Sequence, residues 1–212
     1  MTLIVRNGVP QGSILGPLLF TIVINSLSSS SLHGSLILYA DDACITYSAP
    51  DVKTILSWIT EDLFVLNNWY TSNGLTINFD KTVYMFFSKQ SITESLQPIV
   101  FNNILIRRVV TFKYLGLVLD EKLKWNEHIT HIRARVLPGV RAILKLRKLV
   151  NTQHLLSIYY SLIHTHFTYM AGIWGSASKT NINLLQAIQT RTLKSIFKLP
   201  RTTPKKNLVF QM

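Results

Sequence analysis

The sequence predicts an α+β protein, in which a region of short strands and helices up to residue 120 precedes a mainly helical region. In the first region, short apolar runs alternate with turn residues such as Asn102-Asn103, a pattern typical of hairpins. From Trp125 onward, apolar residues recur at helical spacing instead. A length of 212 residues allows one or two domains with a substantial core.

The two regions also differ in net charge. Residues 1–106 carry four basic and seven acidic side chains, a net charge of −3, whereas residues 107–212 carry 18 basic and three acidic ones, a net charge of +15. No Asp or Glu follows Glu127. Such an excess of one sign favours a polyanionic partner, above all nucleic acid, for the second region. The alternative is a basic surface that only keeps the protein in solution.

A loop, a helix and a hairpin are expected first. Two glycines and a proline in residues 8–13 predict the loop. Pro17 suits the first turn of the helix that follows. The expected apolar face of this helix consists of Leu18, Leu19, Ile22, Val23 and Leu27. The apolar runs 36–39 and 43–47 then predict a hairpin with buried strands and with Asp41-Asp42 at its tip.

A long helix and several short strands are expected next. Asp51 is the candidate N-cap of the helix, and Asn73-Gly74 is its stop signal. Two strands are predicted around a polar turn that contains Lys81, at residues 75–78 and 83–87. The remaining predicted strands are 99–101 and 104–106, which flank Asn102-Asn103, and a strand–turn–strand segment at 112–119.

Three helical segments are expected in the second region. Pro138-Gly139 is expected to end or kink the first, which starts near Trp125 and resumes over residues 140–150. The second is expected at residues 155–174 and the third at 182–199. We expect residues 201–212 to form a flexible tail.

Cysteine usage and hydropathy favour an intracellular protein that is not secreted. Cys44 is the single cysteine, so no internal disulfide is expected. The first six residues are too short for the apolar core of a signal peptide. The longest apolar run, 14–27, is interrupted by polar and helix-breaking residues and falls short of the roughly 20 residues that span a bilayer, so no membrane partner is expected.

The adjacent carboxylates of Asp41 and Asp42 are the strongest chemical signal in the chain. Two like charges at a tight turn repel each other, so a fold seldom places them there for stability alone. A divalent cation between them removes the repulsion, and carboxylate oxygens are ligands that Mg²⁺ prefers. The pair therefore predicts half of a metal site for phosphate chemistry. The alternative is a solvated Asp-Asp turn.

Four motifs, in order, resemble those of reverse transcriptases. Gly8-Val9-Pro10-Gln11-Gly12-Ser13 followed by residues 15–20 resembles motif B, and Tyr39-Ala40-Asp41-Asp42 is similar to motif C. Residues 74–78 with Lys81-Thr82 resemble motif D, and residues 112–116 resemble motif E, the primer grip. Residues 163–191 resemble the segment that follows the palm in non-LTR retrotransposons of the jockey-like type.

This resemblance implies the RNA-directed DNA polymerase of a retrotransposon. The implied fold is an incomplete polymerase palm, an antiparallel sheet with helices, over residues 1–120, followed by an α-helical, thumb-like domain over 121–200. The implied chemistry is two-metal nucleotidyl transfer with Mg²⁺, or with Mn²⁺ in its place. The implied partners are an RNA template, an RNA–DNA hybrid and deoxynucleotides. No feature predicts the oligomeric state.

The resemblance also implies roles for residues in the active site. Asp41 would be the main metal ligand and Asp42 the second one. Lys81 would protonate the leaving pyrophosphate or hold its charge, the alternative being an ordinary surface lysine. The residues implied to shape the nucleotide and template pocket are Gln11, Gly12 and Tyr39. The alternative for Gln11-Gly12 is an ordinary loop before a helix.

Nucleic-acid contacts are implied farther along the chain. Tyr114, Leu115 and Gly116 would position the primer end through backbone contacts, a role that does not exclude a buried strand turn. A hybrid is read through its shape and phosphates, so scattered basic residues suffice. The phosphate contacts are expected from a cluster that consists of Arg133, Arg135, Arg141, Lys145, Arg147 and Lys148. Zinc is not expected, because neither His128 with His131 nor His164 with His166 has a cysteine or carboxylate at ligand spacing.

The chain departs from the family pattern at its start. Only seven residues precede Gly8 and none of them is acidic, so we expect the fingers and the motif-A aspartate to be missing. Without that carboxylate the chain alone is expected to be inactive, as in a truncated or decayed copy of a mobile element. The alternatives are a non-catalytic nucleic-acid-binding remnant, another template-directed polymerase such as an intron maturase, and an interaction protein that kept only the fold.

Overall fold

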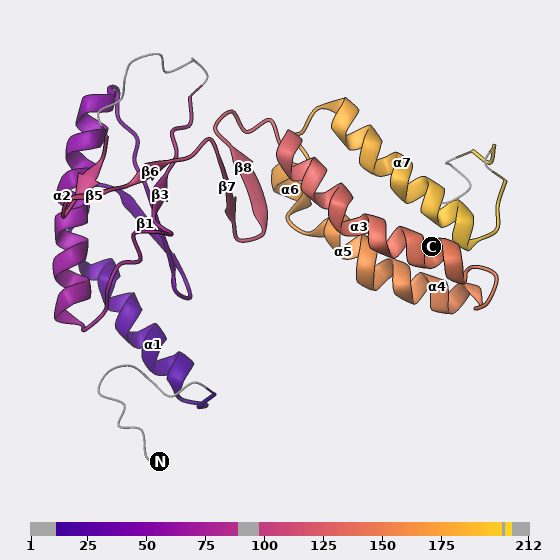
Figure 1. Cartoon of the computed structure of the whole chain (residues 1–212), viewed down its shortest axis with the longest axis horizontal. Coiled ribbons are helices and arrows are strands. Elements are labelled where there is room, and N and C mark those ends of the chain that lie inside the picture. The colour runs from indigo at the N-terminus through magenta and orange to yellow at the C-terminus, as the bar shows by residue number, and fades with distance from the viewer. Residues whose placement is uncertain (1–11, 89–97, 201, 205–212) are drawn as a thin grey trace. The chain divides into compact units, whose positions relative to one another are not determined.

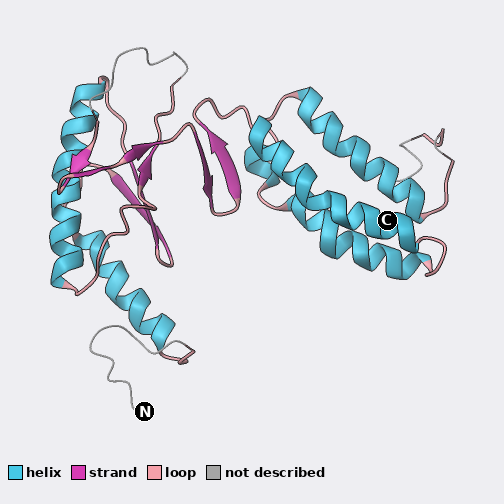
Figure 2. Ribbon diagram, in the orientation of Figure 1, coloured by secondary structure: helices cyan, strands magenta, loops and turns pink. Residues whose placement is uncertain are grey.

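A computed structural model, drawn in Figure 1 and Figure 2, describes residues 12–88, 98–200 and 202–204. The chain divides into two compact units. The first comprises Met1–Tyr84 and Thr93–Arg108, and the second comprises Met85–Ile92 and Val109–Met212. Helices and strands both occur in each unit, so the prediction of a mixed helix-and-strand protein is confirmed.

The first unit combines helices with short two-stranded ladders. Its helical elements are α1 (Gly16–Asn25), the 3₁₀ turn η1 (Ser26–Ser29) and α2 (Val52–Ser72). Its strands are β1 (Ser35–Tyr39), β2 (Asp42–Thr46), β3 (Val83–Tyr84), β4 (Val100–Phe101), β5 (Ile104–Leu105) and β6 (Arg107–Arg108). β1 pairs antiparallel with β2, and β4 with β5, whereas β3 pairs in parallel with β6. Among the described residues these ladders do not join into the single antiparallel sheet that was expected.

Helix α2 forms where its caps predict it. Asp51 has extended backbone and its Oδ1 accepts a hydrogen bond from the Thr54 N–H at 2.8 Å, which satisfies one free donor of the first turn. Gly74 ends the helix with a φ of 67°. The buried core of the unit joins this helix to α1 and to the β4–β5 hairpin, and consists of Ile24, Leu27, Leu63, Leu66, Ile99, Phe101 and Ile106.

The prediction of which residues of α1 face the core is largely wrong. Leu18 and Ile22 are 56% and 60% exposed, and of the predicted face only Leu27 is buried. The buried residue of the helix itself is Ile24, apart from Gly16 at its start. The helix is apolar on almost every side, so its sequence does not single out the side that meets the core.

The two strands predicted around Lys81 are replaced by a turn and a short strand. Residues 75–78 have no strand pairing, and the second strand is reduced to β3. The backbone oxygen of Asn78 accepts hydrogen bonds from the N–H groups of Lys81 and Thr82, at 3.2 and 3.0 Å. This turn draws the chain out of the extended conformation that a longer strand needs.

The second unit is a hairpin followed by packed helices, as Figure 2 shows. Its elements are β7 (Thr111–Tyr114), β8 (Leu117–Asp120), α3 (Asn126–Leu146), α4 (Thr152–Tyr159), the π-helical η2 (Tyr160–His164), α5 (Thr165–Thr168), α6 (Ala171–Trp174) and α7 (Lys179–Ile196). The hairpin belongs to this unit, so the compact units divide at Arg108 and Val109, before the end of the strand-containing region expected at residue 120. The core includes Val136, Ile143, Leu155, Tyr159, Ile163 and Ile196.

Helix α3 does not end at Pro138-Gly139, one of the two outcomes expected there. The helix continues from Asn126 to Leu146 with Pro138 inside it. Buried residues lie on both sides of the proline, among them Val136 and Ile143, and their packing offsets the one hydrogen bond that proline removes. Gly139 is buried, and a Cβ there would lie 2.9 Å from Cγ1 of Ile163, so glycine lets η2 approach closely.

The single helix expected at residues 155–174 is broken. Tyr169 leaves the helical conformation, with φ −59° and ψ 116°, and Met170 has a φ of 49°. The indole Nε1 of Trp174 donates a hydrogen bond to the freed backbone oxygen of Tyr169 at 2.8 Å. No glycine or proline marks this break in the sequence, so periodicity alone predicted continuity. No helix within the described ranges is both long and apolar enough to cross a bilayer.

Candidate functional site

A two-residue turn between β1 and β2 carries the adjacent aspartates. Tyr39 pairs with Asp42 at the end of the hairpin, which leaves only Ala40 and Asp41 in the turn. Ala40 has a φ of 52°, in the left-handed region that tight hairpin turns use. The predicted hairpin is therefore confirmed, although Asp42 is the first residue of β2 rather than part of the turn.

The two faces of this hairpin differ in exposure. Residues paired across an antiparallel ladder share a face, so Tyr39 and Asp42 lie on the same side. That side is open, because Tyr39 is 62% and Ile37 51% exposed. Leu36, Leu38 and Ile45 pack against the core from the other side. The expectation of buried strands thus holds for one face only, and the open face leads to the aspartates.

The base of the hairpin is anchored by Asp62, a residue of α2 that the sequence interpretation missed. Its Oδ1 accepts a hydrogen bond from the His33 N–H at 2.9 Å, and its Oδ2 accepts one from the Gly34 N–H at 3.0 Å. The hydroxyl of Tyr47, just after β2, donates to the same carboxylate. Burial, followed by the charge and hydrogen bond of Asp62, raises the pKa of Tyr47. One buried carboxylate thus holds both open ends of the hairpin whose tip carries Asp41.

The carboxylates of Asp41 and Asp42 suit a hard divalent cation. Both residues are exposed, and neither side chain accepts a hydrogen bond from the described part of the chain. Mg²⁺ in phosphate-transfer sites commonly takes one or two carboxylates and completes its shell with water and substrate phosphates. No group of three or more His, Cys, Asp or Glu residues that would form a fuller cage occurs in the described ranges. The pair therefore suits a magnesium ion whose remaining ligands are water and substrate phosphates.

The other residues expected at this site are partly described. Gly12 has a φ of 82°, and no described atom other than those of its chain neighbours lies within 4 Å of where a Cβ on it would be. Gln11 lies outside the described residues. Lys81 is exposed, and its N–H donates to Oδ1 of Asn78 at 3.2 Å. Within the described residues no hydrogen bond or ion pair joins Lys81 to Asp41 or Asp42.

The β7–β8 turn is held by an unexpected partner. Leu115 and Gly116 occupy it with φ values of 44° and 86°. The hydroxyl of Tyr169, at the break between α5 and α6, donates a hydrogen bond to the backbone oxygen of Leu115 at 2.7 Å. Its ring also lies 3.1 Å from where a Cβ on Gly116 would be. Tyr169 therefore fixes this turn. It lies at the helix break between α5 and α6, which no sequence signal predicted.

His128 connects the same hairpin to α3. Its Nδ1 accepts a hydrogen bond from the Val118 N–H at 3.3 Å, and its Nε2 is buried without a partner among the described atoms. Its ring lies between the indoles of Trp125 and Trp174, with ring centres 6.1 and 5.9 Å away. Burial, and secondarily the neighbouring His131, lowers the pKa of His128. These contacts indicate a neutral histidine that supports packing.

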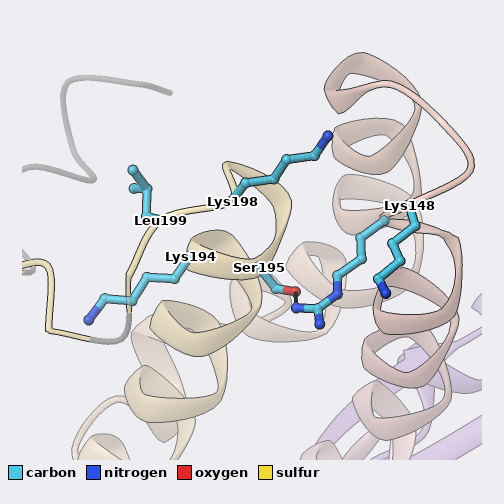
Figure 3. Close-up of a pocket in the computed structure, with 6 residues that line it drawn as sticks. Lys148, Lys194, Ser195, Lys198 and Leu199 are labelled. Atoms are coloured by element: carbon cyan, nitrogen blue, oxygen red, sulfur yellow. Dashed lines mark hydrogen bonds between the residues drawn. The ribbon is translucent and has the colours of Figure 1, made fainter.

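The basic residues predicted to contact phosphates are all exposed. The six lie on α3 or directly after it: Arg133, Arg135, Arg141, Lys145, Arg147 and Lys148. Two of them, Arg147 and Lys148, line a pocket of about 470 Å³ together with Lys194, Ser195, Lys198 and Leu199 of α7 and the residues after it. Figure 3 shows this pocket. The structure thus adds cations of α7 to the cluster expected on α3.

Comparisons with known proteins show the family of the first region. The family described as Reverse transcriptase (RNA-dependent DNA polymerase) matches residues 2–119. The chain is 30% identical over 199 residues to the probable RNA-directed DNA polymerase from transposon X-element of Drosophila melanogaster, an alignment that covers 91% of this chain and 22% of that protein. It is 27% identical over 207 residues to the corresponding protein from transposon BS of the same organism, covering 93% of this chain and 23% of that protein.

A third relative has a similar extent. The RNA-directed DNA polymerase from mobile element jockey of Drosophila melanogaster is 28% identical over 206 residues, covering 92% of this chain and 22% of that protein. The chain therefore spans about a fifth of the length of these curated relatives. No solved structure matches the chain significantly.

Proposed function

Because this chain belongs to the reverse transcriptase (RNA-dependent DNA polymerase) family, we propose that it forms part of the polymerase of a non-LTR retrotransposon, with the β1–β2 hairpin as its site of nucleotidyl transfer. The observation that carries the proposal is the pair of exposed carboxylates on a tight turn whose base is anchored by Asp62. In this proposal residues 1–120 belong to a palm and residues 121–200 to a thumb.

Asp41 and Asp42 are the proposed metal ligands, Asp41 the main one, for Mg²⁺ or for Mn²⁺ in its place. Bound divalent cations supply activation of the primer 3′-hydroxyl and neutralise the leaving pyrophosphate. The contribution of the chain is rigidity, because ligands that are already held in position need little reorganisation during the reaction. The short turn and the buried anchor at the base of the hairpin provide it.

Other residues are assigned to substrate and primer. Tyr39 shares the open face with Asp42 and offers an aromatic surface to the incoming deoxynucleotide, while Gln11-Gly12 adjoin the nucleotide and template. As the bond between the primer oxygen and the α-phosphorus forms and the bond to pyrophosphate breaks, Lys81 donates a proton to the pyrophosphate or holds its charge. The backbone of Tyr114, Leu115 and Gly116 positions the primer end.

The basic cluster of the second unit is assigned to the RNA template and the RNA–DNA hybrid. A hybrid is recognised through its phosphate backbone. The exposed cations of α3 attract these phosphates, and the net charge of +15 over residues 107–212 adds to the attraction. The chain spans about a fifth of the length of its relatives. Binding of the template, the hybrid and the nucleotides is therefore proposed for the complete polymerase, of which this chain would form one part.

Because this chain alone is expected to be inactive, primer extension on an RNA template with Mg²⁺ tests the proposed site in a complete polymerase that contains the chain. Asp41→Asn removes a ligand charge and is expected to lower incorporation at least about 100-fold. Asp51→Asn removes the same charge from an exposed helix cap that Asn also fills well, and it should retain wild-type incorporation. Incorporation that survives Asp41→Asn contradicts the assignment.

A second candidate function is non-catalytic binding of nucleic acid. It is favoured by the strongly basic second region, with its net charge of +15 over residues 107–212. Salt-dependent hybrid binding by the chain, without incorporation even when the chain is part of a complete polymerase, supports this candidate over the first.

A further inference from the structure

The pocket between the ends of α3 and α7 gathers positive charge from two helices. Arg147 and Lys148 follow the last residue of α3, and Lys194, Ser195 and Lys198 lie at the end of α7. Figure 3 shows Lys148 and Lys198 on the same side of the α7 end, whereas Lys194 extends away from them. Arg147, Lys148 and Lys198 therefore contribute positive charge to the lining of one pocket.

One side chain in the pocket is held in place. Nη1 of Arg147 donates a hydrogen bond to Oγ of Ser195 at 3.2 Å, the dashed line in Figure 3. A guanidinium has five N–H donors in a planar fork, and this bond uses one of them. The bond orients the fork before any ligand arrives, which lowers the entropy lost on binding. Lys148 and Lys198 form no hydrogen bond or ion pair within the described residues.

Helix dipoles account for only part of this arrangement. A single cation near a helix C-terminus stabilises the helix through its interaction with the helix dipole. Here cations from two helix ends share one pocket and repel each other, and none of the six residues that line it is acidic. An anion in the pocket removes the repulsion.

We propose that this pocket is a phosphate-binding site for a polynucleotide, in which the fork of Arg147 binds phosphate oxygens while Lys148 and Lys198 neutralise the charge. The inference rests on the proposed function and adds Ser195 and Lys198 to the nucleic-acid interface. Arginine suits phosphate because its parallel N–H groups match two oxygens. None of the six residues that line the pocket is aromatic, so it offers no surface on which a base would stack. The pocket therefore takes a backbone phosphate rather than a base.

The test is fluorescence anisotropy of the full chain with a labelled RNA–DNA hybrid over a range of KCl concentrations. Arg147→Ala/Lys198→Ala is compared with Lys179→Ala/Arg191→Ala, which removes the same charge from exposed residues of α7 outside the pocket. We expect the pocket variant to bind at least about tenfold more weakly than the control and to lower the salt slope by about 1, the value for one phosphate. Equal weakening and equal slopes in the two variants overturn the proposal.

Ser195→Ala keeps the charge and tests the orientation of Arg147. A few-fold loss of hybrid affinity with an unchanged salt slope supports the pocket, whereas wild-type affinity contradicts the role of Ser195. Circular dichroism confirms that each variant is folded. Free deoxyadenosine triphosphate, added as competitor, separates the two sources of phosphate. Displacement of the hybrid by unlabelled hybrid alone supports a backbone site, and equally good displacement by the triphosphate overturns it.

Failure of the pocket and failure of the proposed function give different results. If the wild-type chain binds the hybrid and both double variants weaken it equally, the pocket proposal fails while the assignment of Asp41 stands. If incorporation survives Asp41→Asn but the pocket variant alone loses hybrid binding, the active-site proposal fails while the pocket stands. A wild-type chain that does not bind the hybrid at low salt contradicts the pocket proposal directly.

Discussion

The carboxylate of Asp62 is 1% exposed, yet it lies beneath the hairpin that carries the solvent-exposed Asp41 and Asp42. A buried carboxylate is costly unless its oxygens are satisfied, and here three donors, from His33, Gly34 and Tyr47, satisfy them. In the sequence Asp62 looks like one of two ordinary acids on a helix. Its role depends on the long-range packing of α2 against the hairpin, which spacing along the chain does not reveal.

Asp62→Asn is expected to lower the free energy of unfolding by roughly 1–3 kcal/mol, because an amide nitrogen then faces backbone N–H donors in a buried site. Urea denaturation followed by circular dichroism measures the change. Asp80→Asn removes the same charge from an exposed turn and should change the free energy by less than about 0.5 kcal/mol. Equal stability of Asp62→Asn and the wild type would show that the anchor is unimportant.

His128 is expected to make the second unit less stable in mild acid. Its pKa is lowered, chiefly by burial, so below its usual value near 6.5 the unfolded chain binds a proton that the folded chain does not. Above that pH neither state is protonated at this residue and its contribution to pH dependence vanishes. As the pH falls from about 7.5 to 5.5, the urea midpoint should therefore decrease.

His128→Gln keeps an acceptor for the Val118 N–H but does not titrate, so its midpoint should fall less over the same pH range. A decrease in His128→Gln as large as in the wild type contradicts a buried, neutral histidine.

At the scale of elements, hairpins and capped helices were predictable and interruptions were not. Asn102-Asn103 and the Asp51 cap are local signals, and the β4–β5 hairpin and α2 form where they indicate. The break at Tyr169 and the continuity of α3 through Pro138 depend instead on packing between helices. Both departures lie in the second unit, where neighbouring helices decide the outcome.

Gly139→Ala tests the close approach of α3 and η2. The new Cβ would meet Cγ1 of Ile163 and Cβ of Leu162, at 2.9 and 3.1 Å, and overpacking of this kind costs roughly 1–3 kcal/mol, more than alanine gains in helix propensity. We expect a lower urea midpoint. Gly172→Ala is the matched control, since no atom in the described part of the chain lies within 4 Å of its Cβ position, and it should be neutral or slightly stabilising. A stabilising Gly139→Ala would mean that the helices are not in close contact.

At the scale of the whole molecule, family and charge were readable from the sequence, and the anchors of the site were not. The order of motifs and the +15 charge of residues 107–212 are linear properties of the chain, and the family match over residues 2–119 agrees with the motifs. Asp62, Tyr169 and the α7 cations enter their sites only through folding, because each lies far along the chain from the residues it contacts.

The central claim is that Asp41 and Asp42 bind a divalent cation, and Mn²⁺ titration of the isotope-labelled chain by NMR tests it most directly. Paramagnetic broadening should appear first at the amides of residues 39–43, and Asp41→Asn should weaken Mn²⁺ binding there at least about tenfold. Asp51→Asn should leave the titration unchanged. Broadening that begins elsewhere, or that persists at the hairpin at wild-type affinity in Asp41→Asn/Asp42→Asn, would contradict the account.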